Sequence, residues 1–479
     1  MSQLDVNQPF DLFGQFWKAG EEEKRTPGRL YRTADGIRIQ LFEDLRPGPS
    51  YVAVKQDEQN SVFEVIDSPE KHEPLTLYGR VGQMVGSITA YDCITVHSQS
   101  DLFDSGVGEY ILAPRGVIFG AHTLGVKQTY SGVRVRTRDV DEWANLPGFF
   151  SSEADDGTRS LSYRMPKFEP VALTGGASFT VSQTARLTWP TVRGGSMMRE
   201  VWLQVTDLQL SNWQEIDRRI VTPLSSLITL CVGEVNDLTS IELTIDGRDW
   251  FPLVSNYINY VEPRSERLRV LAGLSDLGFA GVANWLNKVE TLGPLPPVIA
   301  HFSARRDVVK LETELLEMTT VAEGLHRRLR PDQKRISDED RRQARKLVLE
   351  ALKDMEDVKD VLRGVFNHIG ELSYPNRLRG LADIIHDVAP EICGDQNKWS
   401  KVVSDARNSY AHRSAGFLDE SNIDSLFTVV ESLRWLLRCI LLLEAGLDGA
   451  LLGERLRDVS GFRLFLERAA ENLPAIYGP

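Results

Sequence analysis

The sequence predicts an α+β protein of two parts: a β-rich N-terminal domain with a sandwich- or barrel-like sheet, followed by an all-α helical bundle. Residues 1–210 alternate between apolar and polar side chains and are interrupted by Gly and Pro, which is typical of short antiparallel strands. After the proline-rich residues 293–297, apolar side chains recur every three or four positions, which is typical of amphipathic helices. We therefore expect the β-rich domain at residues 1–295 and the helical domain at residues 300–479.

Several short strands are predicted in the first domain. The clearest lie at residues 29–32, 37–42, 132–137, 178–189, 201–207 and 241–245. Strands at this spacing are typical of a sandwich or a barrel. Residues 213–232 instead have helical spacing, which predicts a helical insert that Pro223 can split in two. The insert leaves open whether this domain consists of two subdomains.

The second domain reads as a series of amphipathic helices. They are predicted at about residues 307–329, 358–369, 375–388, 397–412, 422–444 and 451–473, the last broken near residue 460. A further helix is expected after Ser337, because Ser337 and Asp340 form a capping signal. Acidic and basic residues alternate between positions 334 and 346, which predicts a salt-bridged surface helix there.

Composition restricts the class of protein. The chain has 479 residues, of which 42% are hydrophobic and 26% are charged, and its net charge is −13. Residues 301–479 contain 27 Lys and Arg against 30 Asp and Glu, a charge of −3, which leaves −10 for the first 300 residues. An acidic chain argues against indiscriminate coating of nucleic acid but allows a local basic groove. No long apolar run or signal peptide is present, so we expect a cytoplasmic protein without a membrane segment.

Motifs for cofactors and metals are missing from the sequence. The four cysteines lie far apart, at positions 93, 231, 393 and 439, and form no CxxC pair, so we expect buried, reduced thiols rather than a zinc site. GxxxxGK[ST], HExxH and GxSxG are also absent. We expect no metal and no cofactor.

The predicted helix at residues 397–412 combines an apolar stripe with candidate catalytic side chains. The stripe comprises Trp399, Val403, Ala406 and Tyr410. Arg407 lies at its edge, whereas Asn408 and His412 are one turn apart on the polar face. Arg407 and His412 are roughly 140° apart around a helix with 3.6 residues per turn. They can bracket one anion only if it lies over Asn408, or if the helix ends near residue 411.

An Arg and a His can together serve metal-free RNA cleavage. Histidine transfers protons near neutral pH, and arginine stabilises the negative charge of the phosphorane. The spacing alone proves little, since it occurs four times: Arg115/His122, Arg363/His368, Arg379/His386 and Arg407/His412. His386 shares a predicted apolar helix, so we expect a core or interface histidine there. Only the last pair has an Asn directly after the Arg, and a structural role of that helix face is the alternative.

Residues 397–414 resemble the active-site helix of HEPN ribonucleases, whose motif is Arg, a polar residue and then His after four to six residues. Residues 311–327, with Glu323, His326 and Arg327, resemble the first HEPN helix of ApeA-type anti-phage proteins, and residues 372–381 resemble the segment before the active-site helix. Residues 14–17, 27–30 and 120–122 and Trp143 are similar to the ApeA N-terminal β-domain. The resemblance covers nearly the whole chain.

This resemblance implies a role for each motif residue. Arg407 would hold the scissile phosphate, His412 would act as general acid or base, and Asn408 would orient one of them or the ribose 2′-OH. HEPN domains generally act as dimers with two motifs facing one cleft, so a second copy's Arg would complete each site. The products implied are 2′,3′-cyclic phosphate and 5′-hydroxyl ends, formed without a metal.

The resemblance also implies a biological setting and partners. It suggests anti-phage defence by abortive infection, in which host RNA, with tRNA as the leading substrate, is cut after the N-terminal domain senses a phage-derived trigger. A homo-oligomer, at least a dimer through the HEPN domain, is expected. RNA would bind nearby cations, for which the candidates are Arg413, Arg377, Arg379 and Arg327, with a solvated helix face as the alternative for each. The rival function is a non-catalytic interaction protein with a β recognition module and a helical dimerisation bundle.

Overall fold

A computed structural model of the chain describes residues 8–43, 45, 50–57, 60–66, 73–82, 86–99, 109–191, 194–209, 211–256, 258, 270–304, 310–353, 355–368, 370–412 and 423–478. The chain forms two compact units. Unit 1 comprises Met1–Ser225 and Asn236–Arg267, and unit 2 comprises Ser226–Val235 and Leu268–Pro479. The first is built mainly of strands and the second of helices.

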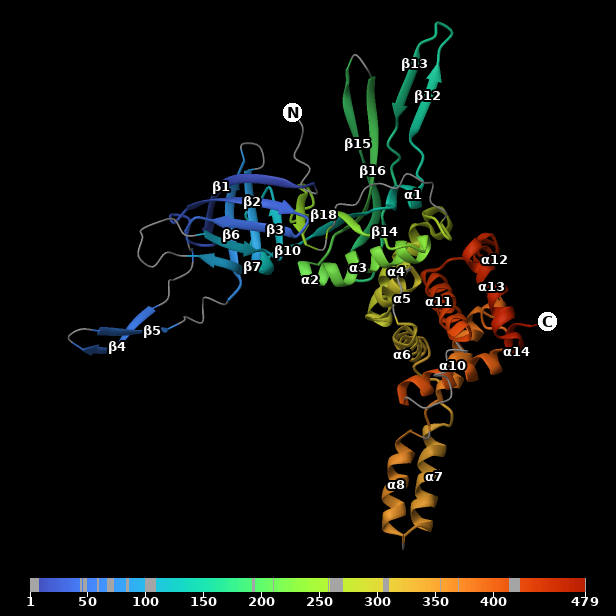
Figure 1. Ribbon diagram of the computed structural model, residues 1–479. Helices are drawn as coiled ribbons and strands as arrows, with labels where there is room; N and C mark the ends of the chain where they lie inside the picture. Colours follow the sequence, from blue (N-terminus) through green and yellow to red (C-terminus); the bar gives the residue numbers. More distant parts are fainter. Residues whose placement is uncertain are drawn as a thin grey trace. The chain divides into compact units, whose positions relative to one another are not determined.

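Unit 1 contains a closed, antiparallel six-stranded barrel (Figure 1). Its strands are β1 (Phe10–Lys18), β2 (Thr26–Thr33), β3 (Gly36–Leu41), β6 (Leu75–Val81), β7 (Gly86–Gln99) and β8 (Glu109–Ala113). They pair in the order β7-β6-β1-β2-β3-β8, and β8 also pairs with β7, which closes the ring. Closure removes the free sheet edges at which other chains could pair.

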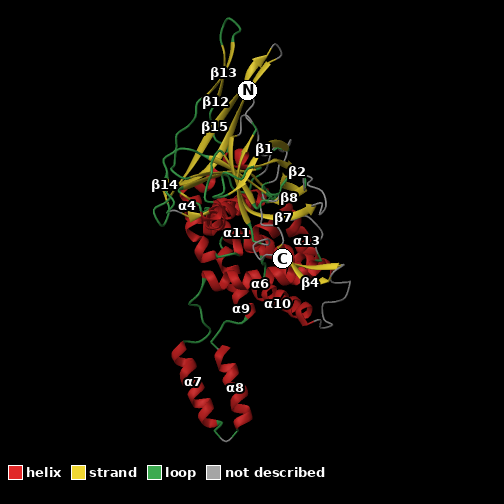
Figure 2. Cartoon of the chain, turned by 90° about the vertical axis from the view of Figure 1, so that its left-hand side faces the viewer, coloured by secondary structure: helices red, strands yellow, loops and turns green. Residues whose placement is uncertain are grey.

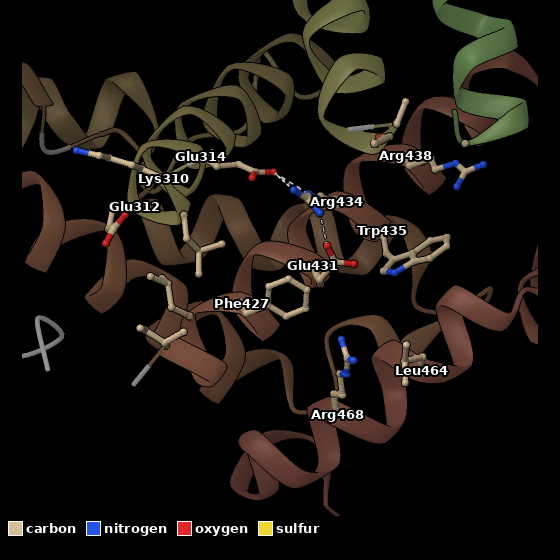
Figure 3. A pocket seen from close by; sticks show the side chains of 16 residues that line it. Lys310, Glu312, Glu314, Phe427, Glu431, Arg434, Trp435, Arg438, Leu464 and Arg468 are labelled. Carbon is tan, nitrogen blue, oxygen red and sulfur yellow. Dashed lines mark hydrogen bonds and ion pairs between the residues drawn. The ribbon is translucent and has the colours of Figure 1, made fainter. Parts of the chain in front are cut away.

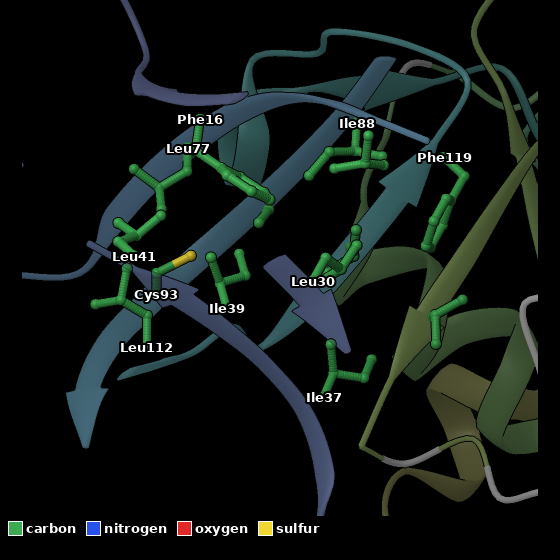
Figure 4. Close-up of a cluster of buried hydrophobic side chains, with 14 of the residues drawn as sticks. Phe16, Leu30, Ile37, Ile39, Leu41, Leu77, Ile88, Cys93, Leu112 and Phe119 are labelled. Carbon is green, nitrogen blue, oxygen red and sulfur yellow. The ribbon is translucent and has the colours of Figure 1, made fainter. Parts of the chain in front are cut away.

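Alternate side chains of the barrel strands point inward and form its core. β3 shows this along its whole length, because Ile37, Ile39 and Leu41 are all buried. Figure 4 shows these three with inward side chains of the other barrel strands and of β9, namely Phe16, Leu30, Leu77, Ile88, Cys93, Leu112 and Phe119. The period-two alternation in the sequence thus reflects a sheet with one buried face.

β7 is shared between the barrel and a second, open part of the sheet. Its first half pairs with β9 (Gly116–Phe119), and its second half pairs with β8. From β9 the sheet continues, antiparallel throughout, in the order β19 (Phe251–Ser255), β18 (Leu238–Thr244), β11 (Gly132–Thr137), β16 (Gly194–Thr206), β15 (Ser178–Thr191) and β14 (Val171–Ala172). The predicted barrel-like sheet is confirmed, and the six predicted strands correspond to β2, β3, β11, β15, β16 and β18.

Smaller elements complete unit 1. Three separate two-stranded sheets are formed by β4 (Ser50–Asp57) with β5 (Asn60–Ile66), β10 (Thr129–Tyr130) with β17 (Ser211–Asn212), and β12 (Phe149–Glu153) with β13 (Arg159–Tyr163). The short helix α1 (Val140–Ala144) buries Trp143.

The predicted helical insert follows β17. It consists of α2 (Trp213–Ile216), a π-helical turn (Asp217–Val221) and α3 (Thr222–Val232). The π turn ends two residues before Pro223, whose missing N–H and bulky ring cannot continue a regular α-helical ladder. The proline therefore changes the pitch of the helix without ending it. The C-terminal part of α3 belongs to unit 2.

Unit 2 is an all-α bundle from α4 onward, as the sequence predicts. Its helices are α4 (Leu274–Leu292), α5 (Leu295–Ala304), α6 (Leu311–Leu329), α7 (Asp338–Ala351), α8 (Glu356–His368), α9 (Tyr374–Ala382), α10 (Gln396–His412), α11 (Ile423–Ala445), α12 (Gly449–Asp458), α13 (Ser460–Asn472) and α14 (Pro474–Tyr477). α11 is buried over most of its length and contacts α4, α5, α6, α9, α10 and α13. A helix that is apolar on nearly all sides forms the centre of a core.

The predicted domain boundary at residues 295–300 falls inside unit 2, because the compact units divide near residue 268. Pro296 and Pro297 lie in the first turn of α5 instead of in a linker. Proline is tolerated there, since the first N–H groups of a helix have no intrahelical partner. The prolines therefore mark the start of a helix.

Helices α7 and α8 form a hairpin that extends away from the other helices of unit 2, as Figure 1 and Figure 2 both show. Ser337 caps α7, since its Oγ accepts a hydrogen bond from the Asp340 N–H at 3.0 Å. Ion pairs join Asp338 to Lys334 and Arg341, and a further one joins Glu339 to Arg342. The predicted salt-bridged surface helix is confirmed.

Candidate functional site

Helix α10 is fixed in the bundle by its apolar stripe. Asp395 begins the helix by accepting hydrogen bonds from the backbone N–H groups of Lys398 and Asn397, which lower the pKa of Asp395. Trp399, Val403 and Ala406 are fully buried, as their spacing predicts. The indole Nε1 of Trp399 donates a hydrogen bond of 2.9 Å to the Ser432 Oγ of α11. Tyr410, the last residue of the stripe, is only half-buried.

Arg407 is held on two sides at the edge of this stripe. One of its Nη atoms donates to the Oε2 of Glu323, on α6, at 3.3 Å. Its guanidinium carbon lies 4.3 Å from the centre of the Tyr374 ring, on α9. Tyr374 is itself fixed, because its hydroxyl donates to the Thr319 carbonyl at 3.2 Å and burial raises its pKa, which keeps the phenol neutral. Three helices thus orient one arginine that remains partly exposed.

Glu323 is the hub of a larger charged cluster. Besides Arg407, it binds Arg327 at 3.0 Å and lies 4.0 Å from Arg377. Glu371, in the segment before α9, also binds both Arg327 and Arg377, at 2.9 and 3.4 Å. Three guanidinium groups therefore share two carboxylates. The cluster has a surplus of one positive charge, which suits it to an anionic ligand.

Two members of this region are buried. Arg377 is 5% exposed, and burial together with the neighbouring Arg327 lowers its pKa. His326 is fully buried behind Arg377, and burial is the main reason why its pKa is lowered. A neutral, enclosed imidazole cannot reach a substrate, so we assign His326 to packing beneath the cluster.

The other predicted site residues lie elsewhere on α9 and α10. Asn408 is exposed. His412 is the last residue of α10, and its side chain lies outside the described part of the structure, as does the whole of Arg413. Arg379 donates hydrogen bonds to the amide oxygens of Asn397, at 2.7 Å, and Asn376. Among the described residues it forms no ion pair, so its positive charge is not neutralised.

The backbone of α10 stays helical through His412. The angle of roughly 140° between Arg407 and His412 around the helix is therefore not relieved by an early end of the helix. On one chain, the two positions therefore lie on different faces of the helix.

The remaining Arg/His pairs with similar spacing lie in other surroundings. Arg115 lies 3.6 Å from Asp92, and His122 stacks on Tyr78 with ring centres 4.8 Å apart. His386 is exposed, so the prediction of a core histidine is wrong. Helix α9 ends at Ala382, and the 3-10 turn that follows leaves His386 at the surface. The side chain of His368 lies outside the described residues.

Sequence reasoning named most of these side chains but not their arrangement. The sequence pattern does not single out Glu371, nor does it show that the ring of Tyr374 contacts Arg407. The one local signal was the spacing of Glu323 and Arg327, which are four residues apart on one helix.

No metal centre or membrane segment is found within the described residues. No group of three or more His, Cys, Asp or Glu there could hold a metal ion. None of the helices among them is both long and apolar enough to cross a bilayer. All four cysteines are buried, as predicted, and none of them forms a disulfide; burial raises the pKa of Cys439 to about 12.

Comparison with protein families covers both units. Residues 11–276 match the family model of ApeA N-terminal domain 1, and residues 316–450 match that of the Apea-like HEPN domain. No curated protein and no solved structure matches the chain. The second match contains the whole Arg407 cluster and all of α10.

Proposed function

The chain belongs to the ApeA family of anti-phage proteins with a HEPN nuclease domain, and on that premise we propose that it is a metal-independent endoribonuclease. The observation that carries the proposal is Arg407, which Glu323 and Tyr374 hold in place while it stays partly exposed. A guanidinium fixed on one edge and one face keeps further N–H donors free for a phosphate.

Arg407 is proposed to stabilise the phosphate during cleavage. The ribose 2′-OH attacks the adjacent phosphorus, the P–O5′ bond breaks, and the 5′-oxygen leaves with a proton. Negative charge builds on the non-bridging oxygens as the phosphorane forms. A preoriented cation next to them is typically worth about 10²–10³ in rate. The products are a 2′,3′-cyclic phosphate and a 5′-hydroxyl.

His412 is proposed to transfer the protons. The reaction removes one proton from the 2′-OH and adds one to the leaving oxygen, and imidazole suits both steps near neutral pH. One histidine per chain serves only one of them at a time. Asn408, which is exposed next to Arg407, is proposed to orient the 2′-OH or one of the two catalytic groups.

We propose that the site is completed across a homodimer. The helical angle separates Arg407 from His412 on one chain, and a second copy facing Asn408 would supply an Arg from the opposite side. Each of the two sites in the dimer would then combine the His412 of one chain with the Arg407 of its partner.

The dimer proposal has a direct test by complementation. Arg407→Ala and His412→Ala subunits are each inactive, and their co-expression would give mixed dimers with one intact shared site. We expect cleavage to return in the mixed dimers only. Activity that stays absent, in mixed dimers confirmed by mass spectrometry, would contradict a site shared in this way.

RNA binding is assigned to cations around the cluster. Arg379 is the first candidate among the described residues, because it lies on α9, the helix that carries Tyr374, and has no carboxylate partner there. Arg413 follows directly after α10. Arg327 and the buried Arg377 would contact RNA only after their pairs with Glu371 open. We propose tRNA as the substrate, since its exposed loop bases suit recognition of unpaired RNA.

The β-rich unit 1 is proposed to sense a phage-derived trigger and to restrain the nuclease until infection, after which cleavage of host RNA stops growth. This division follows from the two family matches, of which only the second contains the Arg407 cluster.

The nuclease itself is tested with total RNA in EDTA. Wild-type protein is expected to cleave, His412→Ala is not, and His368→Ala serves as the matched control because Arg363 and His368 have the same spacing on another helix. Circular dichroism confirms that each variant is folded. Cleavage that is absent from wild type, or equal in His412→Ala, would favour the non-catalytic interaction protein.

A further inference from the structure

A second site lies elsewhere in unit 2, in a cavity of about 870 Å³ (Figure 3). Its walls come from α6, α11 and α13, with the ends of α3 and α5. None of the residues of the Arg407 cluster lines it. The volume falls in the range of pockets for small organic ligands.

One wall of the cavity is a closed ion-pair network. Arg434 donates through Nε to the Oε1 of Glu314 at 2.7 Å and through an Nη to Glu431. Two carboxylates thus surround one guanidinium, and Glu314 is 2% exposed. Because both carboxylates are bound to it, Arg434 joins α6 to α11 and is not available to a ligand.

Two other arginines at the cavity have no carboxylate bound to them in the described part of the chain. Arg438 is buried and donates to two carbonyls at the end of α3, those of Leu230, at 2.7 Å, and Cys231, at 3.4 Å. Gly233 permits this approach, since a Cβ there would lie 2.8 Å from the guanidinium nitrogens. Arg468, on α13, is exposed and points into the cavity in Figure 3. Its charge lowers the pKa of nearby Glu431, and no described carboxylate lies within ion-pair distance of it.

Aromatic side chains form the apolar part of the cavity. The guanidinium carbon of Arg468 lies 6.0 Å from the centre of the Phe427 ring, and both Phe427 and Leu464 are exposed. Trp435 is 9% exposed, and its Nε1–H is buried without a hydrogen-bond partner. Figure 3 shows this nitrogen on the side of the indole that is nearer Glu431. An unpaired buried donor is costly and would be satisfied by a ligand acceptor.

We propose that this cavity binds a mononucleotide. Its phosphate would pair with Arg468, and its base would lie against Phe427 and Trp435, with an acceptor atom on the Trp435 Nε1–H. A ligand of this class supplies both an anion for the guanidinium of Arg468 and a planar ring for the exposed side chain of Phe427. A sugar phosphate lacks the ring, and a free nucleoside lacks the charge.

Calorimetric titration of the full-length protein with AMP tests the proposal. AMP contains no phosphodiester that the proposed nuclease could cut, so binding and cleavage are measured separately. We expect saturable binding of AMP, and adenosine and ribose 5-phosphate to bind about tenfold more weakly or worse, because each lacks one half of the contacts. No binding of AMP, GMP, CMP or UMP would overturn the proposal, as would equal affinity for AMP and ribose 5-phosphate.

Substitutions locate the site. Arg468→Gln is expected to weaken AMP binding about tenfold or more, since a hydrogen bond to a charged group is lost. Arg463→Gln is the matched control, because Arg463 is exposed on the same helix and does not line the cavity. Arg407→Ala is expected to bind AMP as wild type does. Equal effects of the two α13 variants, or loss of binding in Arg407→Ala, would overturn this location.

Discussion

Helix α6 carries two carboxylates that each bind an arginine of another helix, and the two places differ in charge balance. Glu314 is buried and shares Arg434 with Glu431, so two negative charges surround one positive charge. Glu323 is partly exposed and, with Glu371, faces three guanidinium groups. In the first arrangement every charged group has a partner within the protein, and the ion pairs join α6 to α11. The second keeps a positive charge near solvent, which is what a phosphate site requires.

The largest expected effect on stability comes from the ion pair between Arg434 and Glu314. Arg434→Ala would leave Glu314 buried without a partner, and we expect unfolding free energy to fall by about 3–5 kcal/mol. Urea denaturation measures this. The double variant Arg434→Met/Glu314→Leu also removes the buried carboxylate and should recover part of the loss, while Glu431 still lacks its partner. A single variant as stable as wild type would show that the pair is not structural.

At the Arg407 cluster we expect a large effect on the cleavage rate and a small effect on stability. Arg407→Ala should lower the rate of RNA cleavage by about 10²–10³, while the unfolding free energy changes by no more than about 1 kcal/mol, since its pair with Glu323 is partly exposed. Single-turnover cleavage and urea denaturation of the same preparation give both values. A large loss of stability with no specific loss of rate would make Arg407 a structural residue like Arg434.

Glu323 is expected to act as a positioning residue, through Arg407. Glu323→Gln keeps the size of the side chain but removes its charge, so Arg407 is held less firmly, and kcat should fall about tenfold while KM stays similar or decreases. Glu317→Gln, an exposed glutamate on the same helix, serves as the control. An increase in KM with unchanged kcat would instead assign Glu323 to substrate binding.

The smallest expected effect concerns pH and the buried His326. Burial lowers its pKa below the ordinary value of 6.5, so below that pH the unfolded chain binds a proton that the folded chain does not. Stability is therefore complete above pH 6.5 and decreases as the pH falls, by at most about 1.4 kcal/mol per pH unit from this group.

Urea denaturation between pH 7.5 and 5 checks this contribution. We expect His326→Gln to show a shallower loss of stability toward low pH than wild type, and His386→Gln, at an exposed histidine, to match wild type. Equal slopes for His326→Gln and wild type would contradict the assignment of a neutral, buried imidazole.

The parts of the fold with one buried face were predictable from sequence. Strands β2, β3, β11, β15 and β16 alternate because one face packs on a core, and α10 has its stripe for the same reason. Barrel closure was not predictable, because it depends on β8 pairing with both β3 and β7. The compact units divide near residue 268 and not at the proline-rich residues, because prolines at a helix start have the same composition as a linker.

The candidate site was also predictable only in part. Arg407 and the anchoring role of Trp399 follow from spacing on one helix. The contact between Arg407 and Glu323 joins residues 84 positions apart, and Glu371 lies outside any periodic pattern. Such contacts are set by how α6, α9 and α10 pack, which no local pattern reports.

The most direct test of the central claim is the chemistry of the RNA ends. Wild-type protein in EDTA is predicted to leave 2′,3′-cyclic phosphate and 5′-hydroxyl ends, which sequencing after end-specific ligation identifies, and Arg407→Ala is predicted to leave none above background. Cleavage that requires added Mg²⁺, ends that carry a 3′-hydroxyl, or equal cleavage by folded Arg407→Ala would contradict the proposed site.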